Sequence, residues 1–355
     1  MAAWVLFHLN HAGRRPGRGS AKAEPTVDLI FLGTSSGTPT RDRNVSAAAI
    51  KRSDSRRWYL VDCGEGTQHR MLQADLSLQQ LGGVFITHVH GDHCYGLPGL
   101  LASATLAGRT DELLVVAPAD IARFIEAVRA ISQLRLSFPI TFKDVAESAG
   151  GIGTADFDVA PVALSHRVPS YAYAFTERRK PALDTAKLIA DGVPRGPLWG
   201  QLRRAETAMT DDGRVLQRAD YLIAGGRPRT IVVCGDNDTP ALLTAAAARA
   251  DAIVHEATYT SDVQDKVGPA PRHSSARSVA RFAQSVSLKN LVLTHFSPRY
   301  GDDTDHPPSI ADIEAEARRE YAGNLLLARD LDRFRLDRMG RLTRVAQATA
   351  SGLLT

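Results

Sequence analysis

Short apolar runs recur along the chain, and most have the length and β-branched content of buried strands. Strand-like runs dominate the first part of the chain, and runs alternate with amphipathic segments of helical spacing afterwards. This order predicts an α/β protein whose sheets are covered by helices. The expected helices span Ile121–Ser132, Ala241–Ala250, Ser275–Gln284 and Ile310–Tyr321, the third with Ser274 as its N-cap.

Residues that can bind metal ions crowd behind one apolar run. Val84–Ile86 reads as a buried strand, and it is followed closely by His88, His90, Asp92 and His93. Burying these groups without partners would cost on the order of a few kcal/mol each. Imidazole and carboxylate are ligands for Zn²⁺ and similar ions, so the cluster predicts a metal site. A glycine within it, Gly91, is expected to let the backbone bend sharply.

Three further strand-like runs lead to a metal-competent residue. They are Pro161–Leu164 before His166, Ile231–Gly235 before Asp236, and Leu291–Thr294 before His295. Ligands at the ends of neighbouring strands can converge on one edge of a sheet. Seven candidates exceed one tetrahedral zinc and suit two ions that share a carboxylate, with a water between them. Ordinary alternatives exist, because a histidine after a strand is commonly a hydrogen-bonded residue and Gly235-Asp236-Asn237 is also a good turn.

Motifs along nearly the whole chain point to a known family. They are Phe31–Thr34 with Gly37–Thr40, Asp62–Gln68, the histidine cluster with Gly96–Leu101, Gly192–Pro197, His255–Tyr259, His273–Ala276 and His295–Tyr300. The cluster resembles the signature of the metallo-β-lactamase fold, and the Gly-Pro and His295–Tyr300 segments are more specifically similar to ribonuclease Z. Asn237 departs from this pattern, since the family usually has threonine after the bridging aspartate. No departure removes a ligand.

The resemblance implies a four-layer αββα sandwich with a protruding arm. It also implies a metal-dependent endoribonuclease that removes the 3′ trailer from tRNA precursors by hydroxide attack, leaving a tRNA 3′-hydroxyl and a 5′-phosphate on the trailer. Two divalent ions are expected, zinc first and manganese as the alternative. By correspondence, the ligands are His88, His90 and His166 for one ion, Asp92, His93 and His295 for the other, and Asp236 as the bridge.

The same resemblance suggests the catalytic side chains. Asp92 is expected to orient the attacking water or accept its proton. His273 is the candidate general acid, with Glu256 orienting its ring. The alternative for His273 is an ordinary histidine at a helix start. Arg299 is a candidate phosphate clamp, and a structural salt bridge is the equal alternative.

One segment, from about 177 to 222, does not read as core. Its hydrophobic pattern weakens, Gly and Pro recur, and basic side chains outnumber acidic ones. Taken alone, it is typical of a solvated surface insertion. The resemblance instead implies an arm that grips the tRNA elbow by charge and shape. Its expected substrate-binding residues are Gly192, Pro194, Arg195, Gly196 and Pro197.

Composition sets outer limits. The 355 residues are 44% hydrophobic with a net charge of +4, which suits a large core and is compatible with nucleic acid. We expect a nuclease domain over residues 26–355 and a disordered extension over 1–25, with organellar targeting by residues 1–24 as a minor alternative. No segment is apolar enough to span a membrane, and three cysteines indicate a reducing compartment, hence the cytoplasm, without disulfide-linked partners. A homodimer is implied by the resemblance alone.

Two other functions compete with the nuclease. A related hydrolase of small phosphodiesters is disfavoured by the long arm, and a non-catalytic binding protein by the intact ligand set. The seven candidates also leave no place in the metal site for Cys94, which we expect to be a packing residue. The remaining histidines are excluded on the same ground: His8, His11, His69, His255 and His306.

Overall fold

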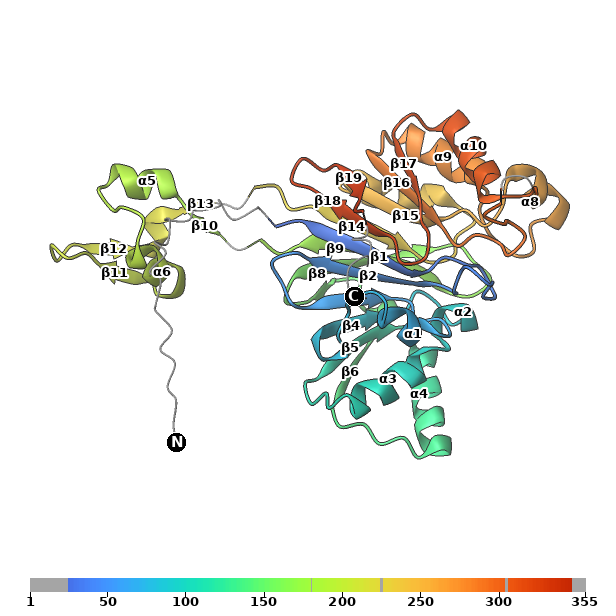
Figure 1. The fold of residues 1–355 in the computed structure, drawn as a ribbon, viewed down its shortest axis with the longest axis horizontal. Helices are drawn as coiled ribbons and strands as arrows, with labels where there is room; N and C mark the ends of the chain where they lie inside the picture. The colour runs from blue at the N-terminus through green and yellow to red at the C-terminus, as the bar shows by residue number, and fades with distance from the viewer. Residues whose placement is uncertain (1–24, 180, 224–225, 304–305, 347–355) are drawn as a thin grey trace, which may run out of the picture.

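Two large sheets form the body of the molecule (Figure 1). The computed structural model describes residues 25–179, 181–223, 226–303 and 306–346. Within these residues the first sheet has eight strands, in the order β19-β18-β1-β2-β3-β4-β5-β6. Their bounds are β1 Val27–Gly33, β2 Ala47–Arg52, β3 Trp58–Val61, β4 Leu81–Phe85, β5 Leu113–Ala117, β6 Ile140–Asp144, β18 Arg333–Leu336 and β19 Leu342–Arg344.

The second sheet of the described chain has seven strands, in the order β17-β16-β15-β14-β9-β8-β7. Their bounds are β7 Ile152–Gly153, β8 Phe157–Leu164, β9 Ser170–Glu177, β14 Thr230–Cys234, β15 Ala252–Glu256, β16 Asn290–Thr294 and β17 Asn324–Leu327. Strands β14 to β17 are parallel, as are β3 to β6 in the first sheet. Strand β8 runs in the direction of β14, because both are antiparallel to β9.

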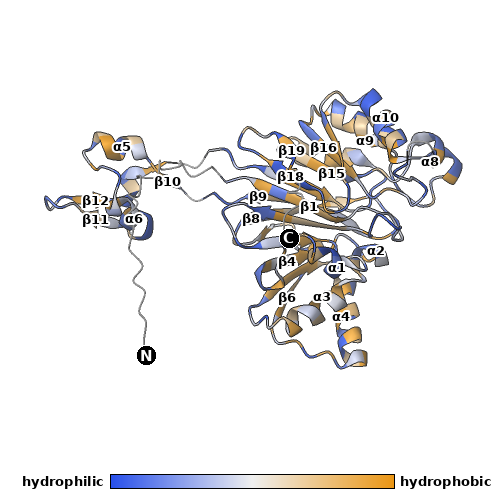
Figure 2. Cartoon of the chain, in the orientation of Figure 1, coloured by the Kyte–Doolittle hydropathy of each residue, from blue (hydrophilic) through white to orange (hydrophobic). Residues whose placement is uncertain are grey.

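Helices cover the outer face of each sheet, which confirms the predicted αββα layers. The first sheet packs on α1 Thr67–Met71, α3 Leu97–Leu106 and α4 Ala119–Ser132, and the second on α9 Ala276–Ser285 and α10 Ile310–Glu320. A third core, rich in aromatic rings, lies between the sheets and includes Tyr59, Phe85, Phe157, Tyr173 and Phe175. Hydrophobic strands therefore fill the interior and polar helix faces line the outside (Figure 2).

Some predicted elements need correction. Ala241–Ala250 is not one helix, since a 3₁₀ turn at Pro240–Leu243 precedes the short α7, Thr244–Ala247. The N-cap of α9 is Ser275 and not Ser274, because the Ser275 side chain accepts a hydrogen bond from the Ser278 amide. No helix in the described part of the chain is long and apolar enough to cross a membrane.

The arm is a small unit that projects from one end of the body (Figure 1). It contains β10 Ala182–Leu183, α5 Thr185–Ala190, α6 Pro197–Arg204, β11 Thr207–Met209, β12 Val215–Gln217 and β13 Leu222–Ile223. Its hydrophobic cluster is separate from the three in the body and is built around Leu188, Trp199 and Leu202. Glu177, predicted to start the arm, is instead the last residue of β9.

A buried ion pair lies where the arm leaves and re-enters the body. Arg229 Nε and one terminal nitrogen donate to the two oxygens of Glu177 at 2.7 and 2.6 Å, and both side chains are almost fully buried. The guanidinium also donates to the carbonyls of Leu336 and Pro25. Burial alone would raise the pKa of Glu177, but the hydrogen bonds and charge of Arg229 lower it. The pair therefore ties the end of β9 to the start of β14.

Replacing Glu177 with glutamine should destabilise the protein by about 3–5 kcal/mol, because Arg229 would keep a buried charge without a counter-ion. The free energy of unfolding, measured by urea denaturation, tests this. The matched control is Asp120→Asn in the exposed pair with Arg123, which should cost less than about 1 kcal/mol. Equal effects of the two substitutions would contradict the prediction.

Candidate metal centre

The first four predicted ligands follow β4. A loop leads from the end of β4 into the short helix α2, Gly91–Cys94, and the Cys63 amide donates to the His93 carbonyl at 2.8 Å. Gly91 is the first residue of this helix and directly follows the extended His90. A Cβ at Gly91 would lie 2.3 Å from the Tyr95 ring, so a larger residue would require this exposed ring to move.

One cluster of candidate ligands joins the two sheets. Its members are His88, His90, His166 and Asp236, and their ligand atoms all lie within 4.8 Å of one another. His88 Nε2 and His166 Nε2 are each 3.6 Å from Asp236 Oδ2. His90 Nδ1 lies 3.1 Å from His88 Nε2 and 3.2 Å from His166 Nε2. Residues from the ends of β4, β8 and β14 thus converge at one edge, as predicted.

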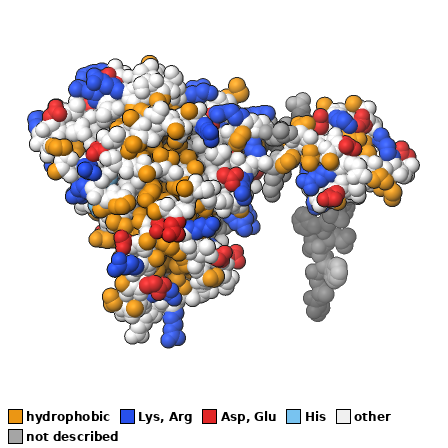
Figure 3. All heavy atoms as spheres, turned by 180° about the vertical axis from the view of Figure 1, so that it is seen from behind, with side chains coloured by type: hydrophobic (Ala, Val, Ile, Leu, Met, Phe, Trp, Pro, Cys, Tyr) orange, Lys and Arg blue, Asp and Glu red, His pale blue; other side chains and the backbone are white. Residues whose placement is uncertain are grey.

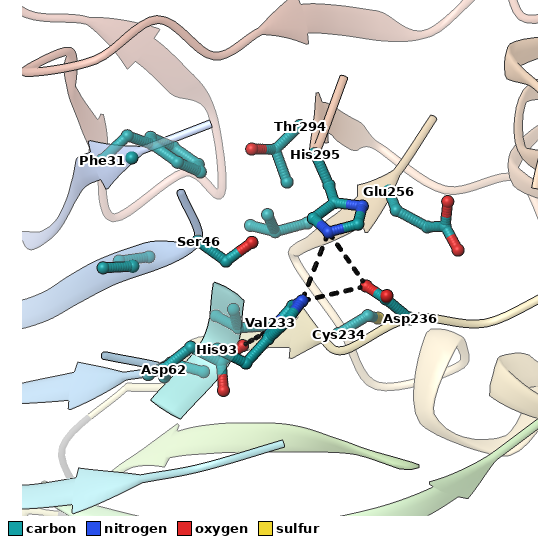
Figure 4. Close-up of a pocket in the computed structure, with 15 residues that line it drawn as sticks. Phe31, Ser46, Asp62, His93, Val233, Cys234, Asp236, Glu256, Thr294 and His295 are labelled. Atoms are coloured by element: carbon teal, nitrogen blue, oxygen red, sulfur yellow. Dashed lines mark hydrogen bonds and ion pairs between the residues drawn. The ribbon is translucent and has the colours of Figure 1, made fainter. Parts of the chain in front are cut away.

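The second cluster contains Asp92, His93 and His295. The Nε2 atoms of the two histidines lie 3.2 Å apart, and Asp92 Oδ2 is 3.5 Å from His93 and 3.3 Å from His295. Asp236 Oδ1 is 3.4 Å from both Nε2 atoms (Figure 4). Asp236 therefore presents one oxygen to each cluster, which is the geometry that a bridging carboxylate requires.

The outer nitrogens of four histidines each face a hydrogen-bond acceptor. They are His88 Nδ1 with Thr87 Oγ1, His93 Nδ1 with Asp62 Oδ2, His166 Nδ1 with the Arg272 carbonyl, and His295 Nδ1 with Thr258 Oγ1, at 3.0, 2.7, 2.8 and 3.1 Å. Both threonine hydroxyls donate to carboxylates and so accept from the rings. Each neutral ring then holds its proton on the outer nitrogen. Converging inner lone pairs around a carboxylate fit a cation site.

Burial and neighbouring charges shift the pKa values of the clustered side chains in opposite directions. Burial lowers the pKa of His88 far below its usual value and also lowers the pKa of His90 and His166. Burial would do the same to His93, but Asp236, Asp92 and Asp62 raise its pKa well above normal. The pKa of Asp236 is well below its usual range, because nearby histidines outweigh its burial.

His273 and Glu256 form a pair beside the clusters, as the sequence interpretation proposed. His273 Nδ1 lies 3.0 Å from Glu256 Oε1 and 3.7 Å from Asp236 Oδ2. Burial would lower the pKa of His273, but the charge and hydrogen bond of Glu256 raise it to about 9. Glu256 is itself almost fully buried and also accepts from the Thr258 hydroxyl. The arrangement holds a protonated imidazole at the edge of the centre.

Asp92 receives a contact that the sequence did not reveal. The Gly37 amide donates to Asp92 Oδ2 at 2.7 Å. Burial would raise the pKa of Asp92, but His93 and His295 hold it well below its usual range. Gly37 has φ of 72°, a left-handed conformation that favours glycine. The turn after β1 therefore contacts the second cluster, and its Gly37 amide orients the Asp92 carboxylate.

The remaining residues that the sequence analysis considered lie outside the two clusters. Arg299 is exposed at the rim, with its guanidinium carbon 5.8 Å from the Tyr259 ring centre. Cys94 belongs to none of the ligand clusters of the described chain, and burial raises its pKa to about 12. His255 is fully buried and hydrogen-bonded through both nitrogens, outside the centre. The predicted arm residues Gly192, Pro194, Arg195, Gly196 and Pro197 line a hollow on the arm, remote from the centre.

Three partners of the ligands were missed. Thr87 and Thr258 orient rings through their hydroxyls, and the carbonyl of Arg272 holds His166. Thr258 falls inside the motif at 255–259, so a signal for it existed. A backbone carbonyl carries no such signal, because every residue has one.

Comparisons with known proteins now bear on this geometry. A family model described as anti-Pycsar protein Apyc1 matches residues 27–124. Human tRNase Z, short form, covers 86% of this chain and 98% of its own length, with a TM-score of 0.56 and 23% identity. The metallo-β-lactamase fold protein YhfI from Bacillus subtilis covers 87% and 99%, with a TM-score of 0.60 and 16% identity. These two structures establish the metallo-β-lactamase fold.

Sequence relatives are more informative than the solved structures. Ribonuclease Z of Marinobacter nauticus is 50% identical over 321 residues, covering 90% of this chain and 99% of the relative. Ribonuclease Z of Pseudomonas putida strain W619 is 49% identical over 320 residues, with the same coverage. Each match covers nine tenths of this chain and nearly all of the relative. The chain therefore belongs to the ribonuclease Z family of endoribonucleases.

Proposed function

We propose that this protein removes the 3′ trailer from tRNA precursors and that its seven clustered side chains hold two divalent metal ions, zinc or alternatively manganese. The observation that carries the proposal is the position of Asp236, which faces one histidine cluster with each carboxylate oxygen. Membership of the ribonuclease Z family supports the type of reaction, and the clustered histidine and aspartate side chains support the binding of metal ions. Cleavage leaves a 3′-hydroxyl on the tRNA and a 5′-phosphate on the trailer.

Each ligand has a proposed place. The first ion is held by His88, His90 and His166, the second by Asp92, His93 and His295, and Asp236 is shared. When bound, such ions lower the pKa of a coordinated water and neutralise charge on phosphoryl oxygens. The protein contributes fixed ring orientations, because the outer nitrogens are already hydrogen-bonded. Asp62 is thereby a positioning residue for His93.

The protein's own groups handle the protons. Asp92 is proposed to orient the attacking water or accept its proton, since neighbouring histidines lower its pKa well below its usual range and favour the carboxylate. The ribose 3′-oxygen leaves from the opposite side of phosphorus and needs a proton. His273 supplies it from Nε2, because Nδ1 is engaged with Glu256. Arg299 is proposed to contact a phosphate at the rim, since it is exposed and has no ion pair within the described residues.

The arm is proposed to recognise the folded part of the substrate. Gly192–Pro197 line a hollow of about 550 Å³ together with Met209, Arg214 and the acidic Asp211 and Asp212. The arm surface mixes Lys and Arg with acidic and hydrophobic side chains (Figure 3), and Ile189, Met209 and Val215 are among the exposed apolar residues. Phosphates and a shaped RNA surface fit such a face better than a small ester does.

We also propose a homodimer. Strand β9 starts beside the centre at Ser170 and ends at the arm root at Glu177, about 23 Å away at ~3.3 Å per residue. The arm thus leaves the body at the end opposite to the metal centre (Figure 1). An arm that points away from its own centre is suited to serve the centre of a second subunit.

The proposed location is the cytoplasm, consistent with three free cysteines.

Two point variants separate metal binding from proton transfer. With a labelled precursor carrying a 3′ trailer, the wild type should cut once, at the end of the acceptor stem. His90→Ala should lose both metal and cleavage. His273→Ala should keep both ions but lose about 10²–10⁴-fold in rate, because the leaving oxygen lacks its acid. Full turnover of metal-replete His273→Ala would remove the assignment.

The His273–Glu256 pair gives a pH prediction for the metal-free protein. His273 should titrate near pH 9 by NMR, and its pKa should fall in Glu256→Gln, where burial acts with less opposition. The raised pKa stabilises the fold fully below pH ~6.5, and this contribution is lost as pH rises through about 9. A Glu256→Gln protein whose His273 still titrates near 9 would exclude Glu256 as the cause.

Removal of the arm distinguishes the tRNA nuclease from a hydrolase of small esters. Replacing 182–223 with a short Gly-Ser linker should abolish precursor cleavage and leave hydrolysis of bis(p-nitrophenyl) phosphate near wild type. The separate hydrophobic cluster of the arm makes an intact body plausible after deletion. Unchanged precursor cleavage would end the arm hypothesis, and activity on the small ester alone in the full protein would favour the alternative hydrolase.

A further inference from the structure

Asn237 stands directly after the bridging carboxylate and is completely buried. Its side-chain oxygen accepts from the Ser165 and Thr239 amides, each at 3.2 Å. Ser165 immediately precedes the ligand His166. One amide side chain therefore connects the loop that follows β14 to the loop that follows β8.

The other end of the amide contacts His255, a buried histidine outside the proposed metal site. His255 Nδ1 lies 2.7 Å from the Glu256 carbonyl, which can only accept, so Nδ1 carries the proton. In the neutral ring Nε2 is then an acceptor, and it lies 3.0 Å from Asn237 Nδ2. The amide must therefore donate to His255, which determines its orientation and satisfies every polar atom of both side chains.

The backbone of Asn237 reaches the proton-transfer pair. Its amide donates at 2.9 Å to Glu256 Oε1, the same oxygen that faces His273 Nδ1. Its carbonyl accepts from the Ser274 hydroxyl at 2.6 Å, and Ser274 is the neighbour of His273. Asn237 thus contacts the loops of His166 and His273, adjoins Asp236 and bonds Glu256, although it faces neither substrate nor metal.

We propose that Asn237, held by His255, is a positioning residue that sets the spacing between the ligands His166 and Asp236 and the general acid His273. The inference rests on the proposed metal sites and goes beyond them, because it assigns a role to two buried residues that bind no ion. Threonine, usual here in the family, has one hydroxyl on a shorter side chain. It cannot span the Ser165 amide and the His255 ring in the same way.

Asn237→Leu removes the amide at nearly constant volume. The variant keeps all seven candidate ligands, but we expect its zinc affinity to fall about 10–100-fold. Chelator competition, started from protein without metal, measures this affinity. For precursor tRNA, kcat should fall while KM stays within about twofold, because the arm is untouched. Asn237→Thr, whose single hydroxyl cannot reach both partners, should recover only part of the affinity.

Asn290→Leu is the matched control. Asn290 is also a buried asparagine, and its side-chain amide donates to the carbonyls of Asp251 and Gly340. It lies at the start of β16, whereas His295 follows the other end of this strand. Its substitution should lower the thermal midpoint of the metal-free protein and leave zinc affinity unchanged. A similar loss of zinc affinity in both variants would mean that Asn237 acts through general stability, and the inference would fail.

His255→Leu tests the same contact from the other side and serves if Asn237→Leu does not fold. It should reproduce a zinc-affinity loss, and the double variant should be no weaker than Asn237→Leu alone, because the pair acts as a unit. Wild-type zinc affinity in either folded single variant, or fully additive losses in the double variant, would overturn the inference. Neither result would touch the proposed reaction, since loss of zinc in His90→Ala tests that separately.

Discussion

The structure depends on how a buried carboxylate, Asp236, is compensated. It lies among lone pairs of several imidazoles at an edge where little water enters, so positive charge has to be present. Asp236, Asp92 and Asp62 accordingly raise the pKa of His93 well above its usual value, against the effect of burial. Bound cations would supply this positive charge directly. The folded core and the proposed chemistry thus share one electrostatic requirement.

The two sheets make that requirement geometrically possible. The ligands come from loops after β4 in one sheet and after β8, β14 and β16 in the other. Their separation is set by the aromatic core between the sheets, where Phe85 packs edge-on against Tyr173 and Phe175. The Tyr173 hydroxyl also donates to the Ile86 carbonyl, two residues before His88. Packing of large rings therefore determines distances between small ligand atoms.

The arm and the body have separate hydrophobic clusters, which suggests separate roles for the two parts. In the body, four of the five candidate ligand rings are oriented by hydrogen bonds on their outer side. The arm has its own small core and meets the body at the buried pair of Glu177 and Arg229. The proposed recognition of a large RNA and the proposed cleavage of one bond would thereby involve different parts of one chain. The ion pair at the root would keep the arm in a defined direction while leaving its surface free to contact RNA.

The sequence by itself indicated four of the strands, the helices α4, α9 and α10, and all seven candidate ligands, but it did not predict α3, which is as long as α9. It could indicate the ligands because their signals are local: a run of six residues holds His88 to His93, and each other ligand follows its own apolar run. It failed where short-range patterns compete, as at Pro240, which starts a 3₁₀ turn, and at Ser274, whose hydroxyl serves Asn237 instead of capping a helix. Only the tertiary structure decided which partners orient the ligands. Asp62 with His93, Arg272 with His166 and Asn237 with His255 are far apart in the chain, and sheet packing alone brings their atoms within hydrogen-bonding distance.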